Sequence, residues 1–270
     1  MAEVAPVFVK LGGSVITDKT KPFTERVDAI ARLAGEIRRA HSRTGLRLLI
    51  GHGGGSYPHT PARLYRTDLG LTDENSRVGI VLVQDAAARL NRIVVSYLLK
   101  EGINAISVQP SCNAVSKNGR IRTWDLRSVR LMLGLNLIPV VYGDVSMDLS
   151  KGCAILSTEE LFRYLARRLR PSRVIVGSDV NGVYDRDPKT TNAARKIAVI
   201  TPKNVKSILQ SLESNKSVDV TGGMMSKVLT LLELARTSKV ECEILDISKP
   251  GHLEAALNGK KGIGTIIRAS

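Results

Sequence analysis

Apolar positions recur along this chain with two different spacings, and together these spacings predict alternating strands and helices. Short apolar runs are typical of buried strands, whereas apolar side chains three and four positions apart are typical of helices. The short runs that we expect to form strands lie at residues 7–10, 46–50, 103–108, 135–142, 174–176, 243–247 and 264–268. The helical spacing occurs at residues 25–41, 76–100, 158–169, 203–212, 224–238 and 251–257. This alternation predicts an α/β fold with a largely parallel sheet.

The order of these elements predicts one domain of three layers, an αβα sandwich in which helices cover both faces of the sheet. Residues 157–160 (STEE) have the pattern of a capping box that opens the following helix. Pro139 lacks a backbone donor, so we expect its strand at an edge or at a bulge. We place a boundary between two lobes near Pro171, which divides residues 1–171 from residues 172–270.

Two glycine-rich turns follow predicted strands and carry most of the chemical information. They lie at residues 10–14 (KLGGS) and 52–59 (HGGGSYPH). Glycine lets a backbone turn its N–H groups toward a ligand, and such a turn before a helix favours phosphate. The patterns of the Walker A loop, the Rossmann dinucleotide site and the serine nucleophile elbow do not occur. The two turns therefore predict two phosphate-bearing ligands, or the two ends of one reaction, bound by a less common motif.

Four side chains near glycine turns are candidates for contacts with phosphate. Lys10 ends the first strand, and Lys227 lies one turn into the helix that follows a third glycine turn, Gly222-Gly223. His59 follows the second turn near a predicted helix start, where an imidazole can donate a hydrogen bond to a phosphate oxygen. Lys19 lies on the loop after the first turn. A solvated lysine or a loop histidine also explains these positions, so spacing leaves both interpretations open.

Three aspartates fall just past predicted strand ends, where α/β sheets place their ligand contacts. They are Asp144, Asp179 and Asp185. The segment 177–184 (GSDVNGVY) is dense in groups that contact a ribose or a base, although plain turn chemistry also explains its composition. His52 ends a strand, and packing or capping accounts for it without a ligand.

A net charge of +15 over 270 residues is a large basic excess. It suits anionic partners, either nucleic acid or phosphorylated small molecules, but also a solvated surface without a partner. The basic residues are dispersed and aromatic residues make up 4% of the chain, too few for stacking bases, so we expect no nucleic-acid partner. Apolar runs shorter than the roughly 20 residues of a membrane helix, and no signal-peptide pattern, predict no membrane association.

Cysteine usage bears on the cellular compartment. The three cysteines are odd in number and widely spaced, and no CxxC pair occurs among Cys112, Cys153 and Cys242. We therefore expect neither a disulfide framework nor a zinc knuckle, and we expect a reducing cytoplasm.

Several segments together resemble the amino acid kinase family and, within it, the isopentenyl phosphate kinase subgroup. The segment HGGGSYPH is similar to the HGxGSFGH motif of that subgroup, including the second histidine, here His59. That histidine separates the subgroup from acetylglutamate, glutamate, aspartate and uridylate kinases. The other segments that carry the resemblance are residues 10–19 (KLGGSVITDK), 109–111 (QPS), 139–145 (PVVYGDV), 177–188 (GSDVNGVYDRDP) and 218–227 (VDVTGGMMSK). The resemblance runs from Val7 to the end of the chain.

The resemblance implies ATP-dependent phosphorylation of isopentenyl phosphate to a diphosphate, in a homodimer, with Mg²⁺ held by phosphates and water rather than by a carboxylate cluster. Lys10 and Lys227 would stabilise charge on the transferring group, with Lys19 assisting near the acceptor. The implied nucleotide contacts are Gly12, Gly13, Ser14, Gly55, Asp179, Tyr184, Gly222 and Gly223, and the implied acceptor contacts are Gly54, His59 and Thr158. Residues 1–171 would carry the acceptor site and residues 172–270 the nucleotide.

This chain departs from the subgroup at two places. Pro58 and Thr60 flank His59 where the subgroup usually has glycine and proline. Ser157-Thr158-Glu159 stands where it usually has Ser-Gly-Asp, whose aspartate positions lysines in related kinases. Glu159 would do so with a longer reach, and Thr158 would place a side chain where glycine leaves the backbone open.

The proposed reaction needs no general base, because a phosphate oxygen is already deprotonated at neutral pH. An isoprenoid acceptor needs an apolar slot, and Ile80, Val83, Ala86 and Ala87 either line that slot or pack in the core. The alternatives are a phosphonate kinase acting on fosfomycin, which shares the second histidine, and a non-catalytic sensor of the same fold. A basic nucleic-acid-binding protein is the third, and the scattered charge disfavours it.

Overall fold

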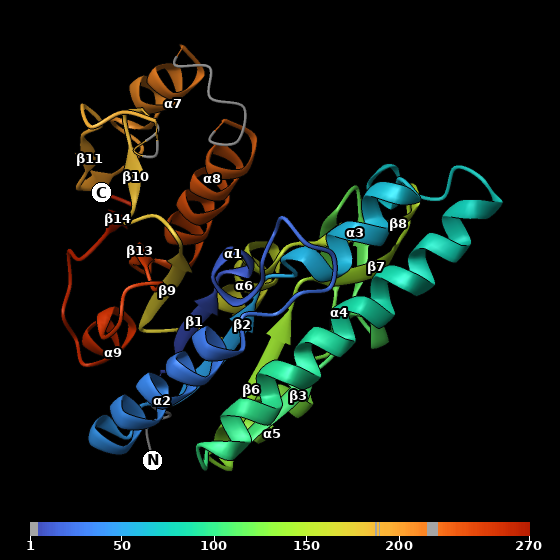
Figure 1. Cartoon of the computed structure of the whole chain (residues 1–270), viewed down its shortest axis with the longest axis horizontal. Helices are drawn as coiled ribbons and strands as arrows, with labels where there is room; N and C mark the ends of the chain where they lie inside the picture. The colour runs from blue at the N-terminus through green and yellow to red at the C-terminus, as the bar shows by residue number, and fades with distance from the viewer. Residues whose placement is uncertain (1–4, 187, 189, 215–220) are drawn as a thin grey trace.

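The computed structural model describes residues 5–186, 188, 190–214 and 221–270 (Figure 1). Its main sheet consists of β1 (Val7–Leu11), β2 (Leu48–His52), β3 (Ala105–Val108), β6 (Ile138–Tyr142), β9 (Arg173–Ser178), β12 (Val199–Ile200), β13 (Cys242–Asp246) and β14 (Thr265–Ile267). The strands lie in the order β12-β14-β13-β9-β1-β2-β6-β3. Neighbouring strands are parallel except β13 and β14. The prediction of a largely parallel sheet is confirmed.

Helices cover both faces of this sheet, as the sequence predicts. The helices are α1 (Gly13–Ile16), α2 (Val27–Thr44), α3 (Ser56–Leu64), α4 (Glu74–Lys100), α5 (Arg127–Gly134), α6 (Thr158–Leu169), α7 (Val205–Ser214), α8 (Thr221–Ser238) and α9 (His252–Leu257), with short 3-10 turns η1 (Thr67–Leu69) and η2 (Pro110–Cys112). Side chains alternate between the faces of a strand. In β1, Val7 and Val9 pack with α2, α4 and α9, whereas Phe8 packs with α5, α6 and α8. Two separate cores therefore sandwich the sheet.

The contact between α2 and α9 shows how a short helix is held in this fold. Glu36 of α2 is buried and accepts hydrogen bonds from the backbone N–H groups of Gly251 and Glu254, at 3.0 and 3.1 Å. Its charge is matched by Arg32, 2.6 Å away. Arg39 of the same helix donates to the carboxylate of Glu254 at 2.8 Å. A carboxylate at a helix N-terminus satisfies donors that the helix leaves unpaired.

A second, four-stranded sheet lies beside α3 and α4, and the sequence pattern did not predict it (Figure 1). Its strands are β4 (Val115–Lys117), β5 (Arg120–Thr123), β7 (Asp144–Asp148) and β8 (Gly152–Leu156), in the order β5-β4-β7-β8. A hairpin of β10 (Val183–Tyr184) and β11 (Lys196–Ile197) was missed as well. These strands are short and partly polar, so they lack the apolar run that marks a buried strand.

The expectation for Pro139 is wrong. Its strand, β6, lies inside the main sheet between β2 and β3, without a register shift. The ladder between β2 and β6 begins only at Val140, one residue after the proline. The missing N–H of Pro139 therefore falls where β2 offers no partner, which allows the proline in an interior strand.

Most other predicted elements are found within two or three residues of their predicted bounds. The helix predicted after residues 157–160 begins at Thr158, and the Ser157 side chain accepts from the backbone N–H of Glu160. No helix in the described part of the chain combines the length and apolar character that a bilayer crossing needs. The three cysteines are free thiols.

Candidate active site

The two glycine turns meet at the carboxyl-terminal edge of the main sheet. The first joins β1 to α1, and the second joins β2 to α3. A Cβ atom on Gly13 would lie 2.5 Å from the backbone nitrogen of Gly55. Gly55 has φ +55°, and a Cβ atom there would lie 2.0 Å from Oγ1 of Thr17. Since the turns pack backbone against backbone, a side chain at either position would push them apart.

Hydrogen bonds tie a third strand end to these turns. The Thr17 hydroxyl donates to the carbonyl of Gly13 at 2.7 Å and accepts from the N–H of Ser56 at 3.0 Å. Ser14, in α1, donates to the carboxylate of Asp179 at 2.8 Å, and Asp179 follows β9. The ends of β1, β2 and β9 thus form one connected floor, the position where open α/β sheets bind ligands.

A cavity of about 500 Å³ opens on one side of this floor. We call it the larger cavity. It is lined by Ser14, Asp18, Lys19, Thr20, Arg26, Ser178, Asp179, Val180, Gly182, Tyr184, Arg186, Pro188, Gly223, Met224 and Lys227. Four predicted nucleotide contacts line it, namely Ser14, Asp179, Tyr184 and Gly223, together with the two predicted lysines Lys19 and Lys227. Gly12, Gly13 and Gly55 belong to the floor, whereas the surroundings of Gly222 lie outside the described residues.

A smaller cavity of about 200 Å³ opens between the second glycine turn and α6. Its lining consists of Lys10, Gly53, Gly54, Pro58, His59, Val83, Gly143, Asp144, Ile155, Leu156, Ser157, Thr158 and Glu159. The three predicted acceptor contacts, Gly54, His59 and Thr158, are all among them. The lining combines polar groups, among them Lys10, His59 and the carboxylates of Asp144 and Glu159, with aliphatic side chains. The aliphatic residues Val83 and Ile155 belong to a small apolar cluster that also includes Ile80. Ala86 packs instead in the core under α4.

A buried ion pair lines the smaller cavity, and its carboxylate also acts electrostatically on Lys227 of the larger cavity. The Nζ atom of Lys10 lies 2.6 Å from Oε1 of Glu159, and the two residues are 8% and 6% exposed. Burial penalises the charge of Glu159, but the charges of Lys10 and Lys227 outweigh burial and hold its pKa below the ordinary value. Burial lowers the pKa of Lys227, and Glu159 opposes that shift. One carboxylate therefore stabilises a lysine from each cavity.

From the resemblance, we expected Glu159 to position lysines in place of the usual aspartate, although it was not among the predicted site residues. Its position in the first turn of α6, one residue after Thr158, was the available signal. The residue that it pairs with is 149 positions away in the chain. Such a distant pairing is visible only once the sheet has brought the two elements together.

Thr158 turns its side chain into the protein. Its hydroxyl donates to the carbonyl of His52 at 2.7 Å. Its methyl group occupies the space that a Cβ atom on Gly51 would fill, at 2.6 Å. Thr158 lines the smaller cavity, but its hydroxyl is hydrogen-bonded to the backbone of β2. The glycine in β2 accommodates the threonine that stands where a glycine was expected.

His59 lies at the mouth of the smaller cavity, on α3, and is an exposed residue. Partial desolvation of its ring, together with the charges of Lys19, Arg63 and Lys10, lowers the pKa of His59 below the ordinary value. The imidazole is therefore neutral at pH 7, with one N–H available as a donor. Lys19 lines the larger cavity, yet its charge contributes to the lowered pKa of His59 at the smaller cavity. Lys19 therefore lies between the two cavities.

His52 has a structural role, as the sequence interpretation allowed. Burial lowers its pKa to about 4, so the ring is neutral. Its Nδ1–H donates to the carbonyl of Gly53 at 3.1 Å, and its Nε2 accepts from Asn91 at 3.1 Å. The ring stacks on Tyr142 with an interplanar angle of 9°. These contacts fix the backbone at the start of the second glycine turn.

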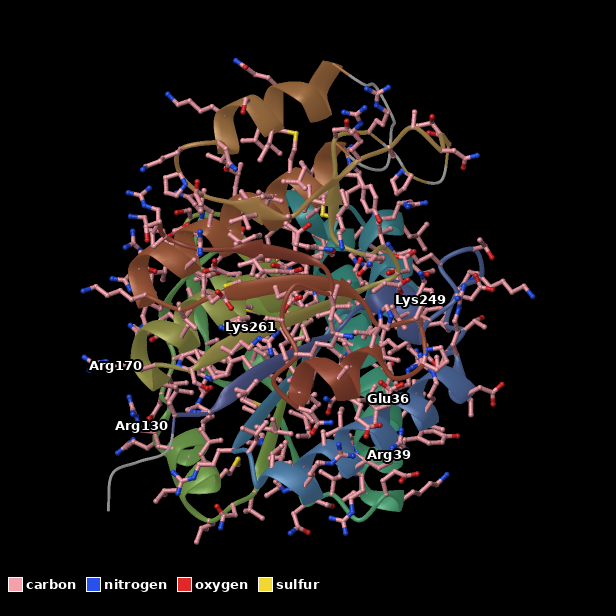
Figure 2. The ribbon with its side chains drawn as sticks, turned by 90° about the vertical axis from the view of Figure 1, so that its left-hand side faces the viewer. Glu36, Arg39, Arg130, Arg170, Lys249 and Lys261 are labelled. Carbon is pink, nitrogen blue, oxygen red and sulfur yellow. The ribbon has the colours of Figure 1, made fainter. Side chains whose placement is uncertain are left out.

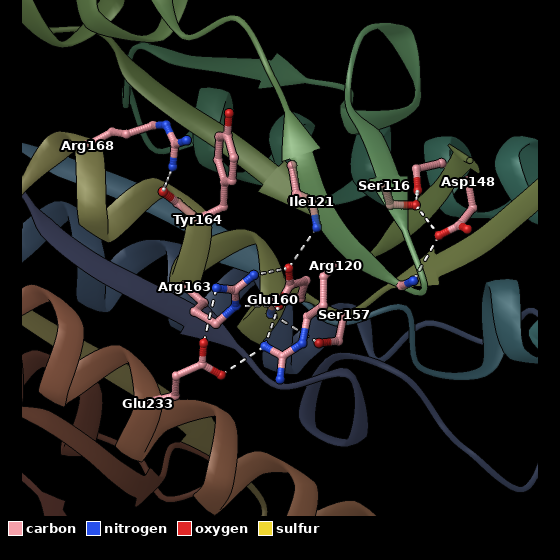
Figure 3. Close-up of polar contacts among 12 residues, drawn as sticks. Ser116, Arg120, Ile121, Asp148, Ser157, Glu160, Arg163, Tyr164, Arg168 and Glu233 are labelled. Atoms are coloured by element: carbon pink, nitrogen blue, oxygen red, sulfur yellow. Dashed lines mark hydrogen bonds and ion pairs between the residues drawn. The ribbon is translucent and has the colours of Figure 1, made fainter. Parts of the chain in front are cut away.

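A network of charged side chains holds together the helices that carry the two ends of this site (Figure 3). Arg163 of α6 binds both carboxylate oxygens of Glu160, at 2.6 and 2.7 Å, and contacts Glu233 of α8 at 3.2 Å. Arg120 of β5 reaches the same two carboxylates. Glu160 also accepts from the N–H of Ile121 at 2.9 Å. The network therefore ties α6, α8 and β5 to one another.

Acidic side chains that could hold a metal ion are sparse here. In the described part of the chain, no group of three or more histidine, cysteine, aspartate or glutamate side chains has the arrangement of a metal site. Asp18 and Asp179 line the larger cavity singly. Such a lining fits Mg²⁺ that arrives with a nucleotide, held by phosphate oxygens and water.

Comparison with known proteins agrees with this geometry. The family model described as "Amino acid kinase family" matches residues 6–246. The isopentenyl phosphate kinase of Methanothermobacter thermautotrophicus is 40% identical over 269 residues, covering 97% of this chain and 98% of that protein. The Methanocaldococcus jannaschii enzyme of the same name is 32% identical, with 93% and 95% coverage.

The solved structures support the same grouping. A crystal structure of an isopentenyl phosphate kinase superposes with a TM-score of 0.82 at 37% identity, covering 97% of this chain and 99% of that one. The product complex of the Thermoplasma acidophilum isopentenyl phosphate kinase superposes with a TM-score of 0.78 at 25% identity, with 97% and 100% coverage. The matched family model, the near-complete coverage and the shared fold show that this chain is a kinase that belongs to the amino acid kinase family.

Proposed function

We propose that this kinase transfers the γ-phosphoryl group of ATP to the phosphate of isopentenyl phosphate, which yields isopentenyl diphosphate and ADP. The observation that carries the proposal is the smaller cavity, whose lining combines polar groups, among them Lys10, His59 and the backbone of Gly54, with aliphatic side chains. A phosphate with a short hydrocarbon tail matches both kinds of group. The isopentenyl phosphate kinases that resemble this chain over 93–97% of its length support the same substrate.

In the transfer, an oxygen of the acceptor phosphate forms a bond to the γ-phosphorus of ATP. The bond from that phosphorus to the bridging oxygen breaks, and ADP leaves with the electron pair. The acceptor oxygen already carries negative charge, so no side chain needs to remove a proton. The difficulty is repulsion between two anions, which fixed cations and backbone N–H groups relieve. Lys10 and Lys227 supply that charge, and Glu159 fixes Lys10 in place.

ATP would occupy the larger cavity in this proposal. Gly12, Gly13 and Gly55 present a backbone floor to its phosphates, and Ser14 lies beside them. Asp179 and Tyr184 also line this cavity, and their side chains suit contacts with the ribose and the base of ATP. Mg²⁺, when it is bound with the nucleotide, would shield phosphate charge, and its ligands would be phosphate oxygens and water.

Isopentenyl phosphate would occupy the smaller cavity. Neutral His59 donates a hydrogen bond to its phosphate, and Gly54 offers its backbone at the same end. The tail would lie against Val83, Ile155 and Leu156. All residues that line this cavity come from positions 10–159, which supports assigning the acceptor site to residues 1–171. Residues 172–270 would then complete the nucleotide site.

We further propose that the protein works as a homodimer in the cytoplasm. Exposed apolar side chains on α4, among them Val78 and Val81, support a contact between two copies. Three free thiols suit a reducing compartment. Light scattering would give a mass near twice the 29.3 kDa of one chain. A mass equal to that of one chain would refute the dimer, but it would not bear on the proposed reaction.

Phosphorus NMR tests the proposed reaction directly. The protein is incubated with ATP and Mg²⁺ and with isopentenyl phosphate, fosfomycin or uridylate in separate samples. We expect the paired resonances of a diphosphate ester to grow fastest with isopentenyl phosphate, at the expense of the monophosphate signal. Faster turnover of fosfomycin or uridylate would overturn the substrate assignment. Failure with every acceptor, in protein that still binds an ATP analogue, would favour the sensor alternative.

A further inference from the structure

A third cavity lies away from the candidate active site and is lined by arginines. It measures about 530 Å³. We call it the arginine cavity, because its lining includes Arg47, Arg130, Arg167, Arg168 and Arg170, together with Pro6. No acidic side chain of the described residues lines it. Figure 2 shows Arg130 and Arg170 projecting outward from the same side of the molecule.

The arginine cavity lies at the opposite end of the sheet from the two active-site cavities. Arg47 directly precedes β2, and Pro6 directly precedes β1, so both mark the amino-terminal edge. Helix α6 connects the two ends of the molecule, with Glu159 in its first turn and Arg167 in its last. A helix of 12 residues is about 18 Å long, so the arginine cavity is a separate site.

Two of the five guanidinium groups are held in place by the protein. Arg168 stacks its guanidinium 3.6 Å from the centre of the Tyr164 ring and donates to the carbonyl of Tyr164 at 3.2 Å. Arg130 of α5 donates to the carbonyl of Arg168 at 2.8 Å. These contacts use only some of the N–H groups of each guanidinium, and none of them involves an acidic side chain. The remaining N–H groups of both side chains are therefore pre-oriented donors.

The other three arginines have no such anchor. Within the described residues, the side chains of Arg47, Arg167 and Arg170 form no hydrogen bond or ion pair with the protein. The buried arginines Arg163 and Arg173, by contrast, are matched by Glu160 and Glu243. The unpaired carbonyl groups at the end of a helix attract one or two cations, but five arginines around one cavity are more than those carbonyl groups account for. Their mutual repulsion is relieved by a bound anion.

We propose that the arginine cavity binds a compact anion with several phosphate groups, of the inorganic diphosphate or triphosphate class. Planar guanidinium forks match phosphate oxygens in pairs, and five of them suit more than one phosphate. The cavity volume lies within the usual range for small ligands. The Tyr164 face is covered by Arg168, so the lining offers no free aromatic surface for stacking a base. These features favour a compact phosphate over a nucleic acid.

Calorimetric titration with inorganic triphosphate tests this site. The protein is first saturated with an unreactive ATP analogue, Mg²⁺ and isopentenyl phosphate, so that active-site binding is suppressed. The titration is repeated for the double variant Arg167→Gln/Arg170→Gln. The matched control is Arg38→Gln/Arg92→Gln, which removes the same charge from two exposed positions on α2 and α4. Since the readout is the difference between the two double variants, it does not depend on the proposed function.

We expect one equivalent of triphosphate to bind, about tenfold to hundredfold more weakly in the cavity variant and unchanged in the control. The variant Arg167→Lys/Arg170→Lys should fall between, since it keeps charge but loses the forks. Unfolding curves establish that each variant is folded. Equal weakening in both double variants, or no binding to the wild type at millimolar triphosphate, would overturn the proposal. Tighter binding of a single-stranded RNA than of triphosphate, lost in the cavity variant, would overturn it in favour of nucleic acid.

Discussion

The two cavities of the active site differ in size, in lining and in the parts of the chain that build them. The larger, of about 500 Å³, takes residues from Ser14 to Lys227, most of which have polar or charged side chains. The smaller, of about 200 Å³, takes residues from Lys10 to Glu159 and has an aliphatic part. The difference suggests that the nucleotide is recognised by charge and backbone, whereas the acceptor is recognised by charge at one end and shape at the other.

The lysines of the site belong to different cavities, Lys10 to the smaller and Lys227 to the larger, and Glu159 interacts with both. The junction between the cavities is thus where two anions would meet. If this comparison is correct, substitutions at the junction lower the rate of transfer and leave acceptor affinity nearly unchanged. Other substitutions in the smaller cavity change acceptor affinity and leave the rate of transfer nearly unchanged.

Removing a junction lysine should have the largest effect. Lys10→Met and Lys227→Met are each expected to lower kcat by about 100- to 1,000-fold, as the loss of one transition-state donor does. Steady-state kinetics with ATP and isopentenyl phosphate measure the effect. Lys203→Met, at an exposed position before α7, is the matched control and should keep full activity. A kcat within threefold of the wild type for either junction variant would remove that lysine from the mechanism.

Neutralising the carboxylate at the junction comes next. Glu159→Gln leaves Lys10 buried without a counter-charge, and we expect kcat to fall about 10- to 100-fold, with a loss of stability of about 3 kcal/mol. Glu159→Asp keeps the charge with a shorter reach and should recover part of both. Kinetics and chemical unfolding measure the two effects. Equal behaviour of the Gln and Asp variants would show that the charge of Glu159 does not position Lys10.

Loss of the donor at the mouth of the smaller cavity should affect one substrate. His59→Ala is expected to raise KM for isopentenyl phosphate about tenfold and to leave KM for ATP unchanged, since one charge-assisted hydrogen bond is lost. His59→Asn retains an N–H donor and should restore most of the affinity. An equal rise in both KM values would mean that the two cavities are not separate binding sites.

The aliphatic part of the smaller cavity should set the length of the acceptor tail. Ile155→Ala removes three carbons from the lining and is expected to favour longer prenyl phosphates by several-fold over isopentenyl phosphate. Val83→Phe fills the same space and should reverse that preference. Competition between two acceptors in one reaction gives the ratio of kcat/KM values. An unchanged ratio in both variants would place the tail elsewhere.

The last prediction concerns stability rather than turnover. His52 is neutral in the folded protein because burial lowers its pKa from 6.5 to about 4. The unfolded chain therefore binds a proton first, so stability is complete above pH 6.5 and falls as the pH drops toward 4. The expected loss is about 3 kcal/mol over that range. Chemical unfolding at several pH values should show this slope in the wild type and a flatter one in His52→Gln; parallel slopes would contradict it.

The sequence predicted the main sheet and its helices because their apolar periods are long and regular. It missed β4, β5, β7 and β8, whose three to five residues alternate too briefly to stand out, and also the two-residue strand β12 of the main sheet and helix α5. It misplaced β6 because Pro139 usually marks an edge, and the offset between the β2 and β6 ladders is a tertiary feature. Local pattern therefore gave the elements, and their pairing came from contacts between distant segments.

The candidate site shows the same division. The glycine turns and His59 were recognisable because a close backbone approach and a fixed spacing leave a mark in the sequence. The partnership of Lys10 with Glu159 left no mark in the spacing, since it joins β1 to the start of α6, and only the resemblance indicated that Glu159 would position a lysine. The accommodation of Thr158 by Gly51 also depends on how α6 packs against β2. Pairings of this kind follow from the assembled fold and cannot be inferred from spacing.

The most direct test of the account compares isopentenyl phosphate with ethyl phosphate as acceptors. Both carry the same phosphate, and three carbons of tail distinguish them. With about 0.8 kcal/mol for each buried carbon, kcat/KM should favour isopentenyl phosphate by about 10- to 100-fold, and Val83→Phe should reduce that ratio. Equal kcat/KM values for the two acceptors in the wild type would contradict the claim that one cavity holds both the phosphate and its tail.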